Sequence, residues 1–165
     1  MKNDLIAQLE NFVAWAVSMG FDPTVNYVNP PDPSEPGEPP VTVPEPLPPG
    51  YLSPNFKASE FACRHCGDLG PGIDQDLIDA LQAMRDHTGQ PITINSGYRC
   101  PTHNANVGGA TNSQHLLGTA ADFTIRGMTP AQVYALLDPV WPGGLGRYNT
   151  FTHIDTRGSR ARWSG

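Results

Sequence analysis

The sequence predicts an α+β domain with a small, mainly antiparallel sheet and flanking helices. Helical spacing of apolar residues is confined to a few segments. Several shorter stretches instead alternate apolar and polar residues and are bounded by turn-forming residues, which is typical of strands. Few long helices and several short strands favour the α+β class. A helix and a proline-rich linker are expected to precede this domain.

Composition divides the chain into three parts. Residues 1–22 predict an amphipathic helix, because Leu5, Leu9 and further apolar residues recur at helical spacing. Residues 23–50 hold a large share of the 18 prolines together with interspersed acidic residues, so we expect a semi-rigid linker without a core. The folded domain is therefore placed at residues 51–165.

Two helices are predicted within the domain. Asp74 can cap the first, whose apolar residues share one face, and Gly89 ends it. Thr129 can cap the second, with Pro130 in its first turn and Pro139 as its stop. We expect the first helix to pack behind the sheet.

Four short segments predict strands. Residues 91–95 alternate and lead into a loop, and residues 120–125 form the next strand, in which Asp122 faces away from its apolar neighbours. Residues 145–148 and 151–155 predict a hairpin. Between and after these strands, residues 104–112 predict a flexible connection, and residues 157–163 a surface tail packed by its tryptophan.

Three polar residues have the spacing of a metal site. His115 and Asp122 stand seven positions apart and are joined by small residues that let the backbone turn, and His153 offers a third ligand. Two neutral imidazoles and one carboxylate suit zinc, since they leave a net positive charge on the ion and a fourth position open for water. The pattern predicts a zinc hydrolase.

The three cysteines suggest a second site. Cys63 and Cys66 form a C-x-x-C pair, and Cys100 and His103 form a C-x-x-H pair. Four such ligands fit a closed, structural zinc site that would join the loop at the start of the domain to the loop after Arg99. The alternatives are a disulfide from Cys63 to Cys66 or Cys100, three buried thiols that act as small apolar residues, and a place for His103 beside the active site.

Charge excludes some partners. The formal net charge is −6 and no basic cluster is visible, so we expect no nucleic acid and no membrane surface as partner. The apolar face of the helix at residues 1–22 has three alternative uses: packing on the main domain, self-association, or attachment to a larger assembly such as a virion.

Several motifs in order carry a resemblance to a known family. They resemble the zinc D-alanyl-D-alanine carboxypeptidase family of peptidoglycan peptidases, which includes phage L-alanyl-D-glutamate endolysins and shares a metal core with lysostaphin-type enzymes and the hedgehog signalling domain. The resemblance covers roughly residues 56–163. The matching text is Ser96-Gly97-Tyr98-Arg99, Ser113-Gln114-His115, Gly118, Ala120, Asp122 and Phe151-Thr152-His153-Ile154-Asp155.

The resemblance implies a role for each matching residue. His115, Asp122 and His153 would bind one catalytic zinc ion. Arg99 would lie near the substrate, where it would act as a catalytic oxyanion donor or hold a substrate carboxylate; a structural ion pair is its alternative. Ser113 would line the substrate-binding cleft.

The sequence departs from the family at one position. Branches of the family place a catalytic acid three residues before the last histidine ligand, where this chain has Thr150. Asp155, which shares a strand face with His153, is the substitute candidate for proton transfer. Its alternatives are to orient the His153 ring or to pair with Arg157.

The expected function follows from the resemblance. It implies a peptidase that cuts a peptide bond of peptidoglycan, either as a D-Ala-D-Ala carboxypeptidase or as a cell-wall endopeptidase, and a phage source. The alternative is a non-catalytic, zinc-containing virion or cell-wall-binding module. No export signal is visible after Met1, so we expect that the protein is made in a cytoplasm and reaches the wall after release or within a phage particle.

Overall fold

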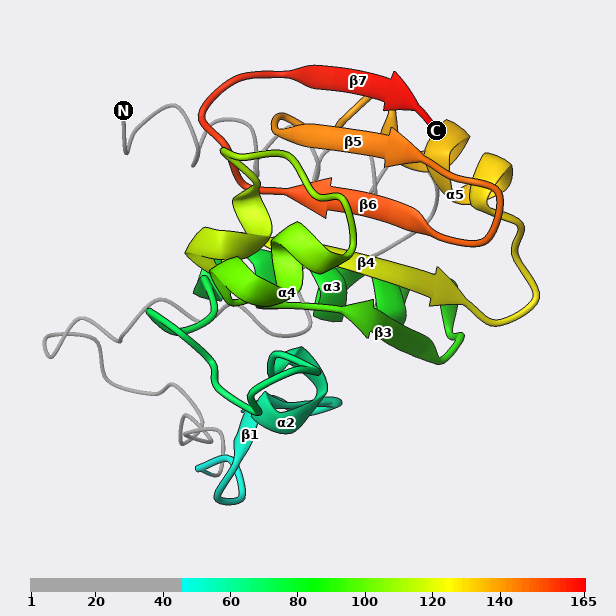
Figure 1. Cartoon of the computed structure of the whole chain (residues 1–165). Coiled ribbons are helices and arrows are strands. Elements are labelled where there is room, and N and C mark those ends of the chain that lie inside the picture. Colours follow the sequence, from blue (N-terminus) through cyan, green and yellow to red (C-terminus); the bar gives the residue numbers. More distant parts are fainter. Residues whose placement is uncertain (1–45) are drawn as a thin grey trace, which may run out of the picture. The chain divides into compact units, whose positions relative to one another are not determined.

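A five-stranded sheet with the strand order β3-β4-β6-β5-β7 forms the centre of the domain (Figure 1). The computed structural model describes residues 46–165, so the predicted helix at residues 1–22 and most of the predicted linker at residues 23–50 lie outside the described residues. Neighbouring strands are antiparallel except β5 and β7, which are parallel. The strands are β3 (Ile92–Ser96), β4 (Ala120–Ile125), β5 (Gly144–Arg147), β6 (Thr152–Asp155) and β7 (Ala161–Ser164).

Short helices and a small second sheet surround these strands. Strands β1 (Tyr51–Ser53) and β2 (Phe56–Lys57) pair antiparallel. The helices are α2 (Ala58–Phe61), α3 (Gln75–Thr88), α4 (Pro101–Asn106), the 3-10 helix η2 (Gln114–Leu117) and α5 (Pro130–Leu137). The predicted α+β class with a mainly antiparallel sheet is therefore confirmed. No helix among the described residues is both long and apolar enough to span a bilayer.

Local signals account for the two predicted helices. The side chain of Asp74 accepts a hydrogen bond from the amide of Asp76 at the start of α3, and Gly89 ends that helix in the left-handed conformation, with φ of 62°. Thr129 forms a capping box with Gln132 at the start of α5. Both helices lie where the caps predict them.

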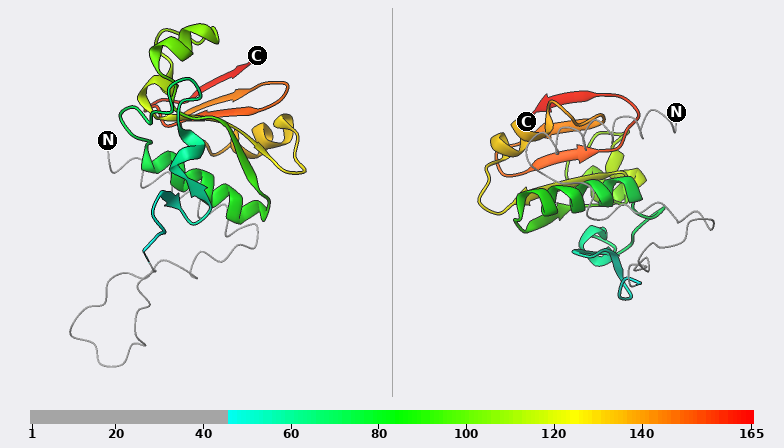
Figure 2. Two further views of the ribbon diagram at one scale, coloured as in Figure 1. Left: turned by 60° about the horizontal axis from the view of Figure 1, so that its bottom comes forward. Right: turned by 180° about the vertical axis from the view of Figure 1, so that it is seen from behind.

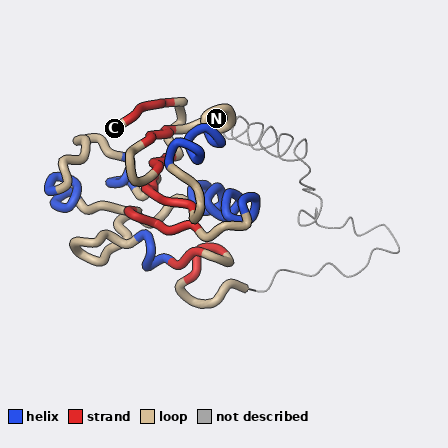
Figure 3. Tube along the Cα trace, turned by 90° about the vertical axis from the view of Figure 1, so that its right-hand side faces the viewer, coloured by secondary structure: helices blue, strands red, loops and turns tan. Residues whose placement is uncertain are grey.

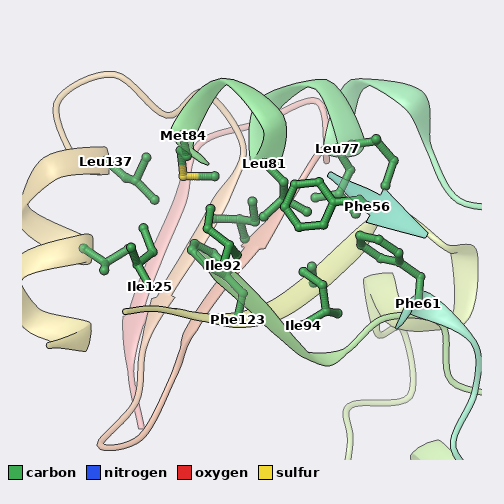
Figure 4. Close-up of a cluster of buried hydrophobic side chains, with 14 of the residues drawn as sticks. Phe56, Phe61, Leu77, Leu81, Met84, Ile92, Ile94, Phe123, Ile125 and Leu137 are labelled. Carbon is green, nitrogen blue, oxygen red and sulfur yellow. The ribbon is translucent and has the colours of Figure 1, made fainter. Parts of the chain in front are cut away.

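The hydrophobic core lies on one face of the sheet, against α3 and α5. Alternate strand residues such as Ile94 and Phe123 point towards Leu81 of α3 (Figure 4). Seen from behind, α3 crosses this face (Figure 2, right). Phe56 and Phe61 close one end of the core; both are fully buried, and their rings form a T-shaped pair with centroids 6.0 Å apart. Each such buried ring stabilises the fold by about 2–3 kcal/mol.

One row of residues crosses the opposite face of the sheet. The strand registers pair Ser96 with Asp122, Asp122 with His153, His153 with Gly146, and Gly146 with Trp163. Because directly paired residues point to the same face, this row gathers Ser96, Asp122, His153 and Trp163 on one face, with Gly146 between the last two. In the side view the strands lie between α3 and the short helix α4, which is on the face of this row (Figure 3).

Two segments differ from the sequence-based predictions. Residues 101–106 form α4, although the loop was predicted to begin at residue 104; Cys100 caps this helix and Pro101 begins it. The predicted surface tail contains β7, which extends the sheet by pairing with β5. Four residues with one apolar aromatic and one basic side chain carry little strand pattern, so pairing with β5 decides their conformation.

Candidate metal centre

The three predicted metal ligands converge on one point. His115 Nε2 lies 3.2 Å from His153 Nδ1 and 3.3 Å from Asp122 Oδ1, and His153 Nδ1 lies 2.8 Å from the same oxygen. Donor atoms that share one zinc ion at 2.0–2.1 Å in tetrahedral geometry are about 3.3 Å apart. The three side chains are 3%, 6% and 8% exposed for His115, Asp122 and His153. The donor set and its spacing therefore fit a zinc ion.

Two kinds of element hold these ligands. Asp122 and His153 are direct partners on the central strands β4 and β6. His115 lies on η2, which ends at Gly118 with φ of 72°. A side chain at Gly118 would collide with the carbonyl oxygen of Gly72, so only glycine allows the chain to turn here towards β4.

Hydrogen bonds decide which ring nitrogens face the centre. His115 Nδ1 lies 2.6 Å from the carbonyl oxygen of Gly97, and since a carbonyl only accepts, this nitrogen carries the proton. His153 Nε2 lies 3.1 Å from Asp155 Oδ2 and carries the proton for the same reason. The lone pairs of His115 Nε2 and His153 Nδ1 are thus left for a metal ion.

Asp155 lies behind the His153 ring. It is fully buried, and its oxygens accept hydrogen bonds from Arg157 Nε at 2.7 Å, Arg157 Nη2 at 2.6 Å and the amide of Gly144 at 3.1 Å. A proton-transfer role requires this carboxylate beside the reacting group, but it contacts the nitrogen of His153 that points away from the centre. These contacts match the two alternative roles given for Asp155, which are to orient the His153 ring and to pair with Arg157.

Arg99 and Ser113 both contact the ligands themselves. The Arg99 guanidinium forms an ion pair with Asp122 Oδ2 through Nη2, and its Nε donates to Ser96 Oγ at 2.8 Å. Asp122 thus uses one oxygen for the centre and the other for Arg99. Ser113 Oγ accepts the amide of His115 at 3.4 Å, so it caps η2 at the edge of the site.

The electrostatics keep the carboxylates ionised. Burial raises the pKa of Asp122, but the adjacent imidazoles of His115 and His153 outweigh this, and its pKa lies well below the usual range. The pKa of Asp155 is lowered in the same way, with His153 and Arg157 outweighing its burial. Burial lowers the pKa of His153, but Asp122 and Asp155 raise it by more. The ionised carboxylate of Asp122 beside two imidazoles suits a divalent cation.

Trp163, which was predicted to lie in a surface tail, borders the metal centre. The ring of Trp163 lies 5.2 Å from that of His153, and its Nε1 donates to the Tyr148 hydroxyl at 3.0 Å. A side chain at Gly146 would collide with the indole, so this glycine makes room for it. A glycine in the middle of a predicted strand was the available signal for this close approach.

The cysteines form a second cluster. The sulfurs of Cys63, Cys66 and Cys100 lie within 4.8 Å of one another, and all three thiols are free. His103 Nδ1 lies 3.3 Å from Cys63 Sγ. Burial raises the pKa of Cys63, but backbone hydrogen bonds from Cys100, Cys66 and His65 outweigh this and lower it to about 5. The structure therefore brings together the three cysteines predicted for a structural site and places His103, the fourth predicted ligand, against Cys63.

The fold and the site define a class of protein. A small antiparallel sheet that presents two imidazoles and one carboxylate on its central strands has the donor set of a metal-dependent hydrolase. The family model described as Peptidase M15 matches residues 54–155, which contain all three ligands. The chain belongs to the peptidase M15 family, and the resemblance to its zinc carboxypeptidases is confirmed.

Two relatives show what this chain is similar to. It is 41% identical over 81 residues to the zinc D-Ala-D-Ala carboxypeptidase of Streptomyces albus G, a stretch that covers 45% of this chain and 31% of that enzyme. It is 33% identical over 121 residues to the peptidoglycan L,D-endopeptidase MepK of Escherichia coli K12, covering 67% of this chain and 66% of MepK. The chain thus spans about a third of the first relative and just under two thirds of the second.

Proposed function

We propose that this protein is a zinc-dependent peptidase that hydrolyses a peptide bond of peptidoglycan. The observation that carries the proposal is the convergence of three donor atoms from His115, Asp122 and His153 at the spacing of one shared ion. One relative is named as a zinc D-Ala-D-Ala carboxypeptidase and the other as a peptidoglycan L,D-endopeptidase, which supports this substrate class.

Each residue of the site has a proposed task. His115, Asp122 and His153 would hold the ion, which when bound supplies a Lewis acid and lowers the pKa of water to near neutrality. Arg99 holds Asp122 so that Oδ1 faces the centre, and its guanidinium places positive charge beside the ligands. Such a charge suits a substrate carboxylate or a developing oxyanion.

Asp155 is proposed as a positioning residue. Its carboxylate fixes the proton on His153 Nε2 and is itself held by Arg157. Thr150 is exposed in the turn before β6 and has no ionisable group, so it cannot transfer a proton to the leaving amine. Asp155 is not assigned this step either, because it contacts the side of His153 that faces away from the centre.

Removal of one ligand tests the proposal. We expect His115→Ala to lose the zinc ion of this centre and to lower kcat/KM on purified muropeptides by at least about 1000-fold, because the metal supplies several kcal/mol of transition-state stabilisation. Metal analysis and mass spectrometry of the products measure both effects. His87→Ala, which changes a histidine on α3, is the matched control and should keep metal and activity.

The products also distinguish the two relatives' reactions. Loss of a single terminal D-alanine indicates a carboxypeptidase, and cleavage within the stem or cross-link indicates an endopeptidase. If the wild-type protein with zinc leaves every muropeptide intact, the peptidase proposal fails.

A second candidate is a zinc-containing module that binds the cell wall without turnover. Thr150 and the position of Asp155 favour it, because no carboxylate among the described residues has been assigned to proton transfer. Binding of wild type to peptidoglycan sacculi without release of any peptide would support it. Attachment to a virion, self-association through residues 1–22, a phage source and synthesis without an export signal stay predictions.

A further inference from the structure

We propose that Cys63, Cys66, Cys100 and His103 bind a second, structural zinc ion that joins the loop after α2 to the segment supporting the catalytic ligands. This site is separate from the centre at His115 and uses none of its residues.

The spacing of the sulfurs supports a shared ion. Thiolates on one tetrahedral zinc ion, at about 2.3 Å each, lie about 3.7 Å apart, and the three sulfurs here are all within 4.8 Å of one another. They come from two segments far apart in sequence, the loop after α2 and the start of α4. Since free thiols gain little from such a three-way approach, a common ligand explains it better than apolar packing does.

Backbone amides complete the surroundings of the sulfurs. The amide of Cys100 donates to Cys63 Sγ at 3.4 Å, and the amide of His103 donates to Cys100 Sγ at 3.4 Å. Amide donors aimed at sulfur stabilise the thiolate form, which is the form that binds zinc. Cys66 is exposed, so the cluster is accessible to an ion from solvent.

His103 is the better fourth ligand of two neighbouring histidines. Its Nδ1 lies 3.3 Å from Cys63 Sγ, whereas His65 Nδ1 lies 3.9 Å from Cys100 Sγ. A nitrogen and a sulfur on one zinc ion are about 3.5 Å apart, so both distances are within reach. His103 is part of helix α4 and partly buried, which fixes its ring more firmly than the exposed loop fixes His65.

The cluster lies directly beside the backbone that holds the catalytic ligands. Cys100 follows Arg99, which is paired with Asp122, and the carbonyl of Gly97 accepts a hydrogen bond from His115 Nδ1. The amide of Tyr98 donates to the carbonyl of Phe61 at 2.8 Å, two residues before Cys63. An ion at the cysteines would therefore tie the segment that contacts His115 and Asp122 to the loop after α2, against which that segment packs.

Metal counting and cobalt spectroscopy test the proposal on the full chain. We expect wild type purified with zinc to hold two equivalents, and a Cys66→Ser, Cys100→Ser double variant to hold one. Loaded with Co²⁺, wild type and His115→Ala should show the near-ultraviolet sulfur-to-cobalt absorption, and the double variant should lack it. The sulfur-to-cobalt absorption depends on the cysteines alone, so it would be unchanged in His115→Ala and would persist if the peptidase proposal failed.

The fourth ligand and the competing states of the cysteines have their own readouts. His103→Ala should lose most of the affinity of the second site and His65→Ala should keep it; the reverse result would overturn the assignment of His103. A wild-type protein with one zinc equivalent and three thiols that react with Ellman's reagent would overturn the site, and so would an intact mass two units lower, which indicates a disulfide.

Discussion

At the scale of single residues, Asp155 illustrates how position decides chemical role. It stands two positions from His153 on one strand, as a general base could, but its oxygens are used by His153 Nε2, Arg157 and the Gly144 amide. Burial of a carboxylate with this many donors favours a fixed, ionised group over one that exchanges protons during turnover.

Asp155→Asn tests that role. We expect the affinity for zinc at the catalytic centre to fall roughly 10- to 100-fold, because an amide orients the His153 ring less firmly, with much of the activity recovered at saturating zinc. Metal titration followed by kcat at saturating metal measures this. Asp138→Asn, which alters a half-exposed carboxylate paired with two arginines, is the control and should leave zinc affinity unchanged. Loss of kcat at full zinc occupancy would instead indicate proton transfer by Asp155.

At the scale of elements, the short turn after η2 sets the relation between His115 and Asp122. Gly118 and Gly108 both have positive φ, of 72° and 68°, but only Gly118 faces a close backbone neighbour. A comparison of these two glycines therefore separates the cost of a steric contact from the cost of the left-handed backbone conformation.

Alanine at these two glycines should have unequal effects. We expect Gly108→Ala to lower the free energy of unfolding by about 1 kcal/mol, the cost of a left-handed residue with a side chain, and Gly118→Ala by about 3 kcal/mol, since the added methyl group must displace the Gly72 carbonyl. Urea unfolding measures both. Gly118→Ala should also reduce zinc binding, and equal effects of the two variants would contradict this account of the turn.

Elements with local sequence signals could be predicted, whereas those that depend on pairing between distant segments could not. The caps Asp74, Gly89 and Thr129 adjoin the helices that they end, so the local sequence was sufficient to place both helices. The three ligands were found because their types and order match a known metal pattern, and the structure brings them together. Strand β7 depends on its pairing with β5, which no local pattern reports. Gly146 signals that some group approaches its strand closely, but not that this group is Trp163.

At the scale of the whole molecule, residues from Leu47 to Gly165 form one compact unit, which contains every residue assigned to the two sites. We expect a fragment that begins at Leu47 to unfold within a few degrees of the full chain, to bind the same zinc equivalents and to have the same kcat/KM on soluble muropeptides. Calorimetry, metal analysis and kinetics provide the comparison. A markedly lower unfolding temperature for the fragment would show that residues 1–46 contribute to this unit.

The order of the strands has a further consequence for the catalytic centre. Asp122 and His153 lie on β4 and β6, which are bordered on either side by β3 and β5, while the sheet margins are β3 and β7. Fraying begins at such margins and reaches interior strands only when most of the sheet has opened. Two of the three ligands therefore keep their relative placement through the local fluctuations of the native state, and a metal ion that leaves would find the same pocket on its return.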